Sequence, residues 1–161
     1  MPFTATSVLL SIAALLFYCL HVDAAPGYCN GESLKRGCQR IGLDGFFQYT
    51  FAARVPVYAS GSTFAEDCMM NNGAEGKGVK ALQYSLNNCY TSKPQDKLEE
   101  DGKYGSLTKA AVKAAQKRIG ADQDGIYGPE TKSKMSWYGK GLSYPENRCF
   151  LYKYTLGGCL R

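Results

Sequence analysis

The sequence predicts a mainly α protein, a three-helix bundle with an internal pseudo-repeat, flanked by disulfide-linked arms with short β segments. Three observations lead to this prediction. Residues 68–138 carry apolar side chains at helical spacing, and a nine-residue word occurs twice within them. The segments on either side, 25–67 and 139–161, are rich in Gly and aromatic residues and contain cysteines.

The first segment, 1–24, has the features of a signal peptide. Its core, VLLSIAALLFYCL at 8–20, is shorter than the roughly 20 apolar residues that a membrane-spanning helix needs. The short residues before Ala25 favour cleavage after Ala24. We therefore expect a secreted, extracellular protein whose mature form has no membrane span.

Cleavage would also remove His21, the only histidine of the chain. Without imidazole, the mature protein has no Ser–His or Cys–His nucleophile pair and no zinc site that uses histidine. The turns around Gly102 and Gly125 lack the acidic residues that an EF-hand needs at both ends of its calcium loop. We therefore expect no catalytic residue, no metal and no cofactor, and predict that the protein is not an enzyme.

The cysteine count and the net charge indicate what kind of protein this is and what kind of partner it binds. Once Cys19 is removed, an even number of cysteines remains, which favours three disulfides in an exported chain. These cysteines are Cys29, Cys38, Cys68, Cys89, Cys149 and Cys159, and the sequence leaves their pairing open. Loss of Asp23 leaves 19 basic against 13 acidic side chains, a net charge of +6. This excess favours an anionic partner, although it also fits a role in solubility alone.

The N-terminal arm, 25–67, predicts strands. Aromatic and β-branched residues bounded by Gly and Pro occur in FFQYTF at 46–51 and in RVPVYAS at 54–60. We expect two short β segments there. The C-terminal arm, 139–161, is again rich in Gly and Tyr and ends with two cysteines.

The middle segment, 68–138, predicts helices at 77–88, 106–119 and 129–137. Val79, Leu82 and Leu86 recur at helical spacing in the first. Gly120 caps the second, and Pro129 suits the first turn of the third. The second helix has a shared face formed by Leu107, Ala111, Ala115 and Ile119.

The repeated word is DGKYGSLTK at 101–109 and DGIYGPETK at 124–132. In each copy Asp-Gly makes a turn, and the tyrosine, Tyr104 or Tyr127, can pack inward. We expect Gly105 and Gly128 to let the chain enter the next helix, so that valine at either position would unfold the protein. A motif that occurs twice in this way indicates a structural role. We call each copy a joint, because its turn connects one helix to the next.

The order of these motifs resembles the small peptidoglycan-binding domain attached to many bacterial wall hydrolases. The shared pattern is V-x-x-L-Q-x-x-L-N, then D-G-x-aromatic-G-x-x-T, V-x-x-x-Q, and D-G-x-x-G-x-x-T, matched from Val79 to Thr131. The resemblance covers residues 78–137 and implies a three-helix bundle that attaches non-catalytically to peptidoglycan. It gives no role to the flanking arms, and we expect no catalytic domain beside the module.

Five residues in or near the repeated word are the predicted ligand-binding set. Aromatic faces stack on sugar rings, and carboxylates fix hydroxyl and amide groups. For each tyrosine, a buried packing role competes with ligand binding. The set is Tyr84, Asp101, Tyr104, Asp124 and Tyr127.

The leading hypothesis is a secreted, monomeric, non-catalytic protein that binds peptidoglycan or a related cell-wall polymer, with no nucleic-acid partner. One alternative is a small wall hydrolase that uses carboxylates, for which Glu99, Glu100 and Glu130 are the candidates. Another is a secreted effector or inhibitor that binds a protein. Three lysines four apart in the second helix form a solvated face or a contact strip for an anionic polymer: Lys109, Lys113 and Lys117.

Overall fold

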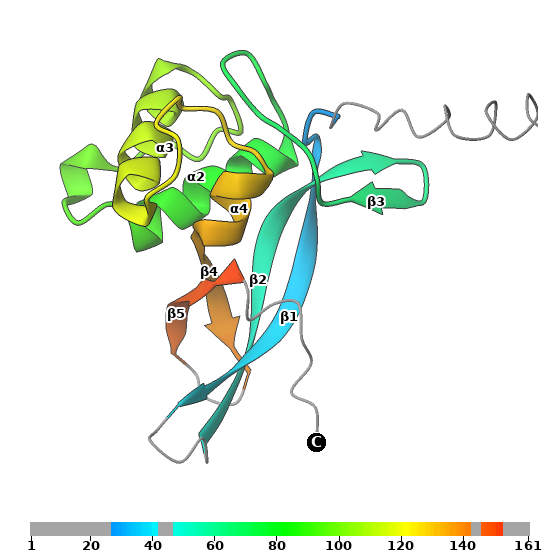
Figure 1. The fold of residues 1–161 in the computed structure, drawn as a ribbon, viewed down its shortest axis with the longest axis vertical. Helices are drawn as coiled ribbons and strands as arrows, with labels where there is room; N and C mark the ends of the chain where they lie inside the picture. Colours follow the sequence, from blue (N-terminus) through cyan, green and yellow to red (C-terminus); the bar gives the residue numbers. More distant parts are fainter. Residues whose placement is uncertain (1–26, 42–46, 143–145, 153–161) are drawn as a thin grey trace, which may run out of the picture.

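A computed structural model describes residues 27–41, 47–142 and 146–152, and Figure 1 shows their arrangement. An antiparallel sheet has the strand order β1-β2-β4-β5, and β3 pairs separately with β2. Three α-helices in the described part lie together at one end of this sheet (Figure 1). The proposed signal peptide, His21 and Cys159 lie outside the described residues.

A long hairpin of β1 (Gly31–Ile41) and β2 (Phe47–Ser60) forms half of the sheet. Its register places Gly31 opposite Val57 and Ile41 opposite Phe47. Every second residue of β2 from Phe51 to Val57 is buried, because side chains alternate between the two faces of a strand. The short β3 (Thr63–Ala65) pairs with the end of β2.

The other half of the sheet comes from the C-terminal part of the chain. There β4 (Ser136–Gly141) pairs with β5 (Asn147–Leu151), with Trp137 opposite Phe150. Three residues of β2 pair with β4 and join the two halves. Gly139 permits this contact, since a Cβ at that position would lie 2.7 Å from the Ala52 carbonyl oxygen.

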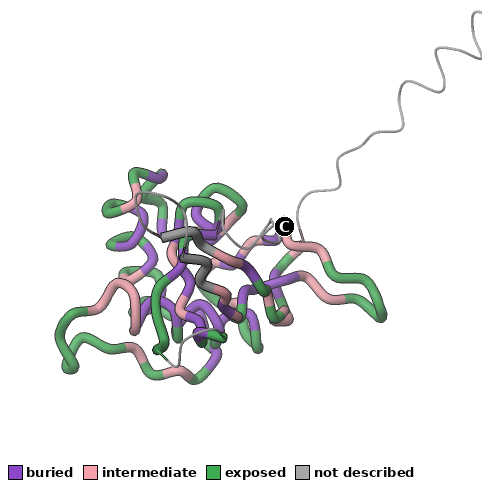
Figure 2. The backbone as a smooth tube through the Cα atoms, turned by 90° about the horizontal axis from the view of Figure 1, so that it is seen from below, coloured by how far each residue is buried: buried purple, intermediate pink, exposed green. Residues whose placement is uncertain are grey.

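The helices are α2 (Lys77–Cys89), α3 (Ser106–Ile119) and α4 (Pro129–Lys134). A 3-10 turn, η1 (Pro94–Asp96), lies in the loop between α2 and α3. Gly120 ends α3 in the left-handed conformation, with φ at 65°, as the sequence predicts. In Figure 2 the buried segments lie in the middle of the molecule and the projecting loops are exposed.

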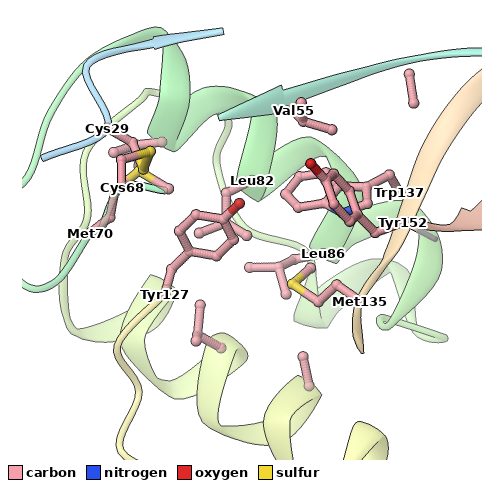
Figure 3. Close-up of a cluster of buried hydrophobic side chains, with 14 of the residues drawn as sticks. Cys29, Val55, Cys68, Met70, Leu82, Leu86, Tyr127, Met135, Trp137 and Tyr152 are labelled. Atoms are coloured by element: carbon pink, nitrogen blue, oxygen red, sulfur yellow. A yellow bond between two sulfur atoms is a disulfide. The ribbon is translucent and has the colours of Figure 1, made fainter. Parts of the chain in front are cut away.

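One hydrophobic core is shared by helices and sheet. Leu82 and Leu86 of α2 pack with Val55 of β2 and Trp137 of β4, and all four side chains have zero relative exposure. Figure 3 shows Leu86 near Trp137, with Tyr152 beside the indole. The helical segment therefore buries its apolar face partly against strands and not only against its own helices.

Two disulfides connect segments that lie far apart in the sequence. Cys29 pairs with Cys68, and Cys89 at the end of α2 pairs with Cys149 in β5. Cys38 is also disulfide-bonded. Each of these two bridges joins a flanking arm, 25–67 or 139–161, to the middle segment 68–138, as the sequence predicts.

The predicted fold class, a mainly α bundle with small β arms, is wrong. Apart from Phe46, which lies outside the described residues, the two segments predicted as short strands in the N-terminal arm belong to the single strand β2. The helix predicted at 129–137 ends at Lys134, and the chain continues as β4 because Trp137 and Gly139 face the core and pair with distant strands. The helices predicted at 77–88 and 106–119 are confirmed to within one residue.

Candidate functional site

A buried glutamine organises the first copy of the repeated word. The side-chain amide of Gln83, on α2, donates to Asp101 Oδ1 at 2.9 Å, to the Lys103 carbonyl at 3.1 Å and to Thr108 Oγ1 at 3.3 Å. In return, the backbone N–H of Gly102 donates to Gln83 Oε1 at 2.9 Å. One side chain from the preceding helix thereby holds the turn and the start of α3.

The second copy repeats this network. Gln116, on α3, donates to Asp124 Oδ1 at 2.8 Å, to the Ile126 carbonyl at 2.9 Å and to Thr131 Oγ1 at 3.1 Å. The N–H of Gly125 donates to Gln116 Oε1 at 2.9 Å. The glutamines of the V-x-x-L-Q and V-x-x-x-Q motifs therefore serve as the fixed points of two equivalent joints.

Both aspartates take part in these joints. Asp101 Oδ1 also accepts from the N–H of Lys103, and Asp124 Oδ1 accepts from that of Ile126, each at 2.8 Å. Hydrogen bonds from Gln83 and Lys103 lower the pKa of Asp101, because they favour its charged form. In each carboxylate, one oxygen is committed to the turn.

The two tyrosines of the repeated word are buried. Tyr104 is 1% exposed and donates its hydroxyl to the Gly125 carbonyl at 3.0 Å. Tyr127 is fully buried against Trp137, and its hydroxyl has no hydrogen-bond partner among the described residues. Burial raises the pKa of both phenols, since it disfavours the phenolate. This burial favours a packing role for the two tyrosines over a role in ligand binding.

The structure does not gather the five predicted ligand residues at one surface. Two are buried rings, two are turn aspartates at separate joints, and Tyr84 is 38% exposed on α2. Tyr84 makes an edge contact with Tyr138 of β4, with ring centres 5.4 Å apart. Ligand binding by the five remains a prediction.

A cleft of about 630 Å³, which we call the helical cleft, lies between the end of α2, the η1 loop and α3. Leu107, Ala110 and Ala114 of α3 line one side, and Lys93 and Gln95 of the η1 loop line the other. The small alanines leave space between the helix and the loop. Leu107 is 75% exposed, whereas the sequence analysis grouped it with Ala115, which is buried.

Tyr90 and Arg118 also line the helical cleft and contact each other. The Arg118 guanidinium carbon lies 5.5 Å from the centre of the Tyr90 ring, and its Nη1 donates to the Tyr90 carbonyl at 2.7 Å. An apolar wall, an aromatic ring and polar groups on a loop suit a ligand with both sugar and peptide parts. The sequence analysis did not predict these residues as part of a site.

The candidate carboxylates make separate contacts. Glu130 pairs with Lys134 at 2.7 Å, and hydrogen bonding to that amine lowers the pKa of Glu130. Glu100 accepts from the Asn87 side chain at 3.0 Å. Among the described residues, no group of three or more His, Cys, Asp or Glu side chains could hold a metal ion. No helix in the described part is long and apolar enough to cross a membrane.

The joints and the helical cleft fall within one family match. Residues 75–135 match the family model described as a putative peptidoglycan binding domain. This match confirms the resemblance seen in the sequence. The match covers less than half of the 161-residue chain.

Two curated relatives come from Bacillus licheniformis. The N-acetylmuramoyl-L-alanine amidase CwlL is 42% identical over 139 residues, which cover 78% of this chain and 38% of the amidase. A probable N-acetylmuramoyl-L-alanine amidase is 41% identical over 68 residues, which cover 42% of this chain and 19% of that protein. No solved structure matches the chain.

These relatives contradict the prediction that the protein is not an enzyme. Both relatives are named as N-acetylmuramoyl-L-alanine amidases. The prediction relied on the absence of histidine after cleavage. That absence excludes only the catalytic mechanisms that use histidine. The chain spans 38% and 19% of the two relatives, so the activity in their names belongs to those whole proteins.

Proposed function

We propose that this protein binds peptidoglycan in the helical cleft and takes part in amide hydrolysis of the cell wall. The observation that carries the binding proposal is that every residue lining this cleft falls within the family segment 75–135. The names of the relatives support the link to amide hydrolysis.

The chemistry of the helical cleft supports binding of a glycan with attached peptides. Leu107 and the Tyr90 ring offer apolar surface to the faces of sugar rings. Lys93, Lys97 and Arg118 provide cations for peptide carboxylates, and Gln95 can exchange hydrogen bonds with amides. Both parts of the polymer therefore find complementary groups.

Sedimentation with purified insoluble peptidoglycan tests the binding proposal. Ala114 is exposed and lines the cleft, so Ala114→Trp should fill it, keep the fold and lower the bound fraction at least about tenfold. Lys113→Trp is the matched control, because Lys113 is the adjacent exposed residue and does not line the cleft. Equal binding by the two folded variants would reject this location.

Hydrolysis is tested on the same walls. An amidase releases free amino groups from the peptides without new reducing ends, and the chain by itself should be assayed for both. Glu99→Gln, Glu100→Gln and Glu130→Gln then test the three candidate carboxylates one at a time. Release of reducing ends without amino groups would contradict an amidase role.

We also propose that the protein is secreted as a monomer after cleavage behind Ala24. The apolar core at 8–20 and the disulfide-bonded cysteines support export. Intact mass and light scattering of the protein from culture fluid test this. A mass that retains residues 1–24, or a dimer at micromolar concentration, would contradict it.

A further inference from the structure

A second cleft lies between the sheet and α2, and we call it the sheet cleft. It consists of two pockets of about 420 Å³ each that share Arg54 and Tyr84. One pocket is lined mainly by residues of β1, β2 and β4, and the other by residues from the first half of α2. No residue that lines the sheet cleft also lines the helical cleft.

The sheet cleft is cationic. It is lined by five basic residues, Arg36, Arg54, Lys77, Lys80 and Lys140, and by two acidic ones, Glu32 and Glu100. Glu32 pairs with Arg54, and Glu100 accepts from Asn87.

Four of the basic side chains remain available to a ligand. Arg36, Lys77, Lys80 and Lys140 are exposed and make no ion pair with any described residue. They come from β1, α2 and β4, so the fold brings together charges that lie far apart in the sequence. Positive charge lining a concave surface concentrates anions there.

Apolar surface lies between these charges. The Tyr84 ring is 38% exposed and is held by its edge contact with Tyr138, which lines the same pocket. Leu34 and Leu142 are more than half exposed and line this pocket as well. A tyrosine face and two leucines beside cations suit a chain of rings that carry anionic groups.

We propose that the sheet cleft binds an anionic glycan chain. Sugar rings lie against Tyr84 and Leu34, and their carboxylates or phosphates lie beside Arg36, Lys80 and Lys140. The choice of a glycan over a nucleic acid rests on the wall binding and the export that we propose above for the same chain. This site is formed mainly by strands outside residues 75–135 and does not depend on peptidoglycan binding in the helical cleft.

Soluble polymers test this proposal in matched pairs. Polygalacturonate is compared with its fully methyl-esterified form, and phosphorylated mannan with neutral mannan, by titration at low and high salt. We expect the anionic member of at least one pair to bind at least about tenfold more tightly at low salt, and the pair that responds identifies the anion. Equal binding within both pairs, or tighter binding of a single-stranded oligonucleotide, would overturn the proposal.

Two charge-matched triple variants locate the binding. The cleft variant Arg36→Gln, Lys80→Gln, Lys140→Gln should lose about tenfold in affinity for the anionic polymer. The control Lys109→Gln, Lys113→Gln, Lys117→Gln removes the same charge from exposed positions on α3 and should bind like the original protein. Equal loss in both variants would mean that net charge alone attracts the polymer, and would reject the site.

Two single variants complete the test. Tyr84→Ala should weaken binding of the anionic glycan but not the salt dependence, because it removes the ring contact and leaves the charges. Ala114→Trp should leave this binding unchanged while it blocks the helical cleft, so that failure of one proposal is distinguishable from failure of the other. Loss of glycan binding in folded Ala114→Trp would show that the helical cleft is the site.

Discussion

At the scale of single residues, two glutamines explain why the chain repeats one word. Gln83 and Gln116 are each about 1% exposed, and each satisfies a turn that contains Asp-Gly. A buried amide is tolerated only when its donors and acceptor find partners. The glutamine lies 18 positions before Asp101 in the first copy and 8 before Asp124 in the second, so the fold, and not a fixed sequence spacing, brings each glutamine to its turn.

Gln83→Leu and Gln116→Leu should each destabilise the protein by about 1–3 kcal/mol, because both leave a buried glycine N–H without an acceptor. Urea unfolding monitored by circular dichroism measures this. The control is Gln95→Leu, since Gln95 is exposed in η1. A loss at only one joint would contradict the equivalence of the two copies.

The backbone conformation shows that glycine is required at other positions than the sequence analysis predicts. Gly105 and Gly128 are extended, and a Cβ at Gly105 would have open space, so the expectation that valine unfolds the protein there is not supported. Gly102 and Gly125 have φ of 75° and 71°. Glycine is therefore required at the second residue of each copy, Gly102 and Gly125.

Gly102→Val and Gly125→Val should each cost at least about 1–2 kcal/mol, because a left-handed backbone is strained for a residue with a Cβ. At Gly102 the new Cβ would also lie 3.0 Å from the Gly76 carbonyl oxygen. Thermal melting compares these variants with Gly105→Val as the matched control. A lower melting temperature for Gly105→Val than for Gly102→Val would refute the assignment.

Asp101 should contribute to acid sensitivity. Its folded-state pKa is lowered by the hydrogen bonds from Gln83 and Lys103, so its contribution is present above the ordinary Asp pKa and is lost as pH falls through the folded value. The stability of Asp101→Asn should thus depend less on pH in the acidic range. Urea midpoints at several acidic pH values measure this, and an unchanged slope would contradict it.

At the scale of elements, one disulfide connects a helix to a strand, and another connects the segment before β1 to the loop after β3. Cys89–Cys149 joins the end of α2 to β5 across 60 positions, and Cys29–Cys68 spans 39. Each bridge limits the freedom of the unfolded chain. The strands at the two ends of the chain are thereby held close to the helical segment.

Cys89→Ala with Cys149→Ala should destabilise the protein by about 2–5 kcal/mol. Denaturant unfolding of this variant is compared with that of Cys29→Ala with Cys68→Ala, which tests the other bridge. Intact mass before and after reduction reports the number of bridges. Free thiols at Cys89 and Cys149 in the purified protein would contradict the pairing.

At the scale of the whole molecule, the helical segment and the sheet form one core. The buried α2 leucines, Trp137 of β4 and the stacked pair Phe51–Phe150 belong to the same cluster. Removing the strands would expose apolar surface that the three helices cannot cover among themselves. The predicted boundary of a helical domain at 68–138 is therefore a testable proposal about independent stability.

The excised segment 68–138 should melt at a much lower temperature than the full chain, or lack a cooperative transition. It loses Phe51, Val55 and Phe150 from the core, and burial of each such side chain contributes about 1.5–3 kcal/mol. Circular dichroism and hydrogen exchange measure this, with Cys68→Ser and Cys89→Ser in both proteins as a control for lost disulfides. A cooperative transition at the same temperature would establish an independent domain.

The sequence by itself determined the local features: two helices nearly to the residue, the left-handed cap at Gly120, the repeated joint and its family. These depend on contacts within a few turns of chain, such as helical periodicity and Asp-Gly geometry. Only the tertiary structure decided the sheet, the shared core and both clefts. Strand pairing between β2 and β4 joins residues that lie 86 (Ala53 and Gly139) to 90 (Phe51 and Gly141) positions apart, and no local pattern encodes which distant edges meet. Trp137 shows the same limit. Its local sequence fits the end of a helix, but it lies in a strand because it pairs with the distant Phe150.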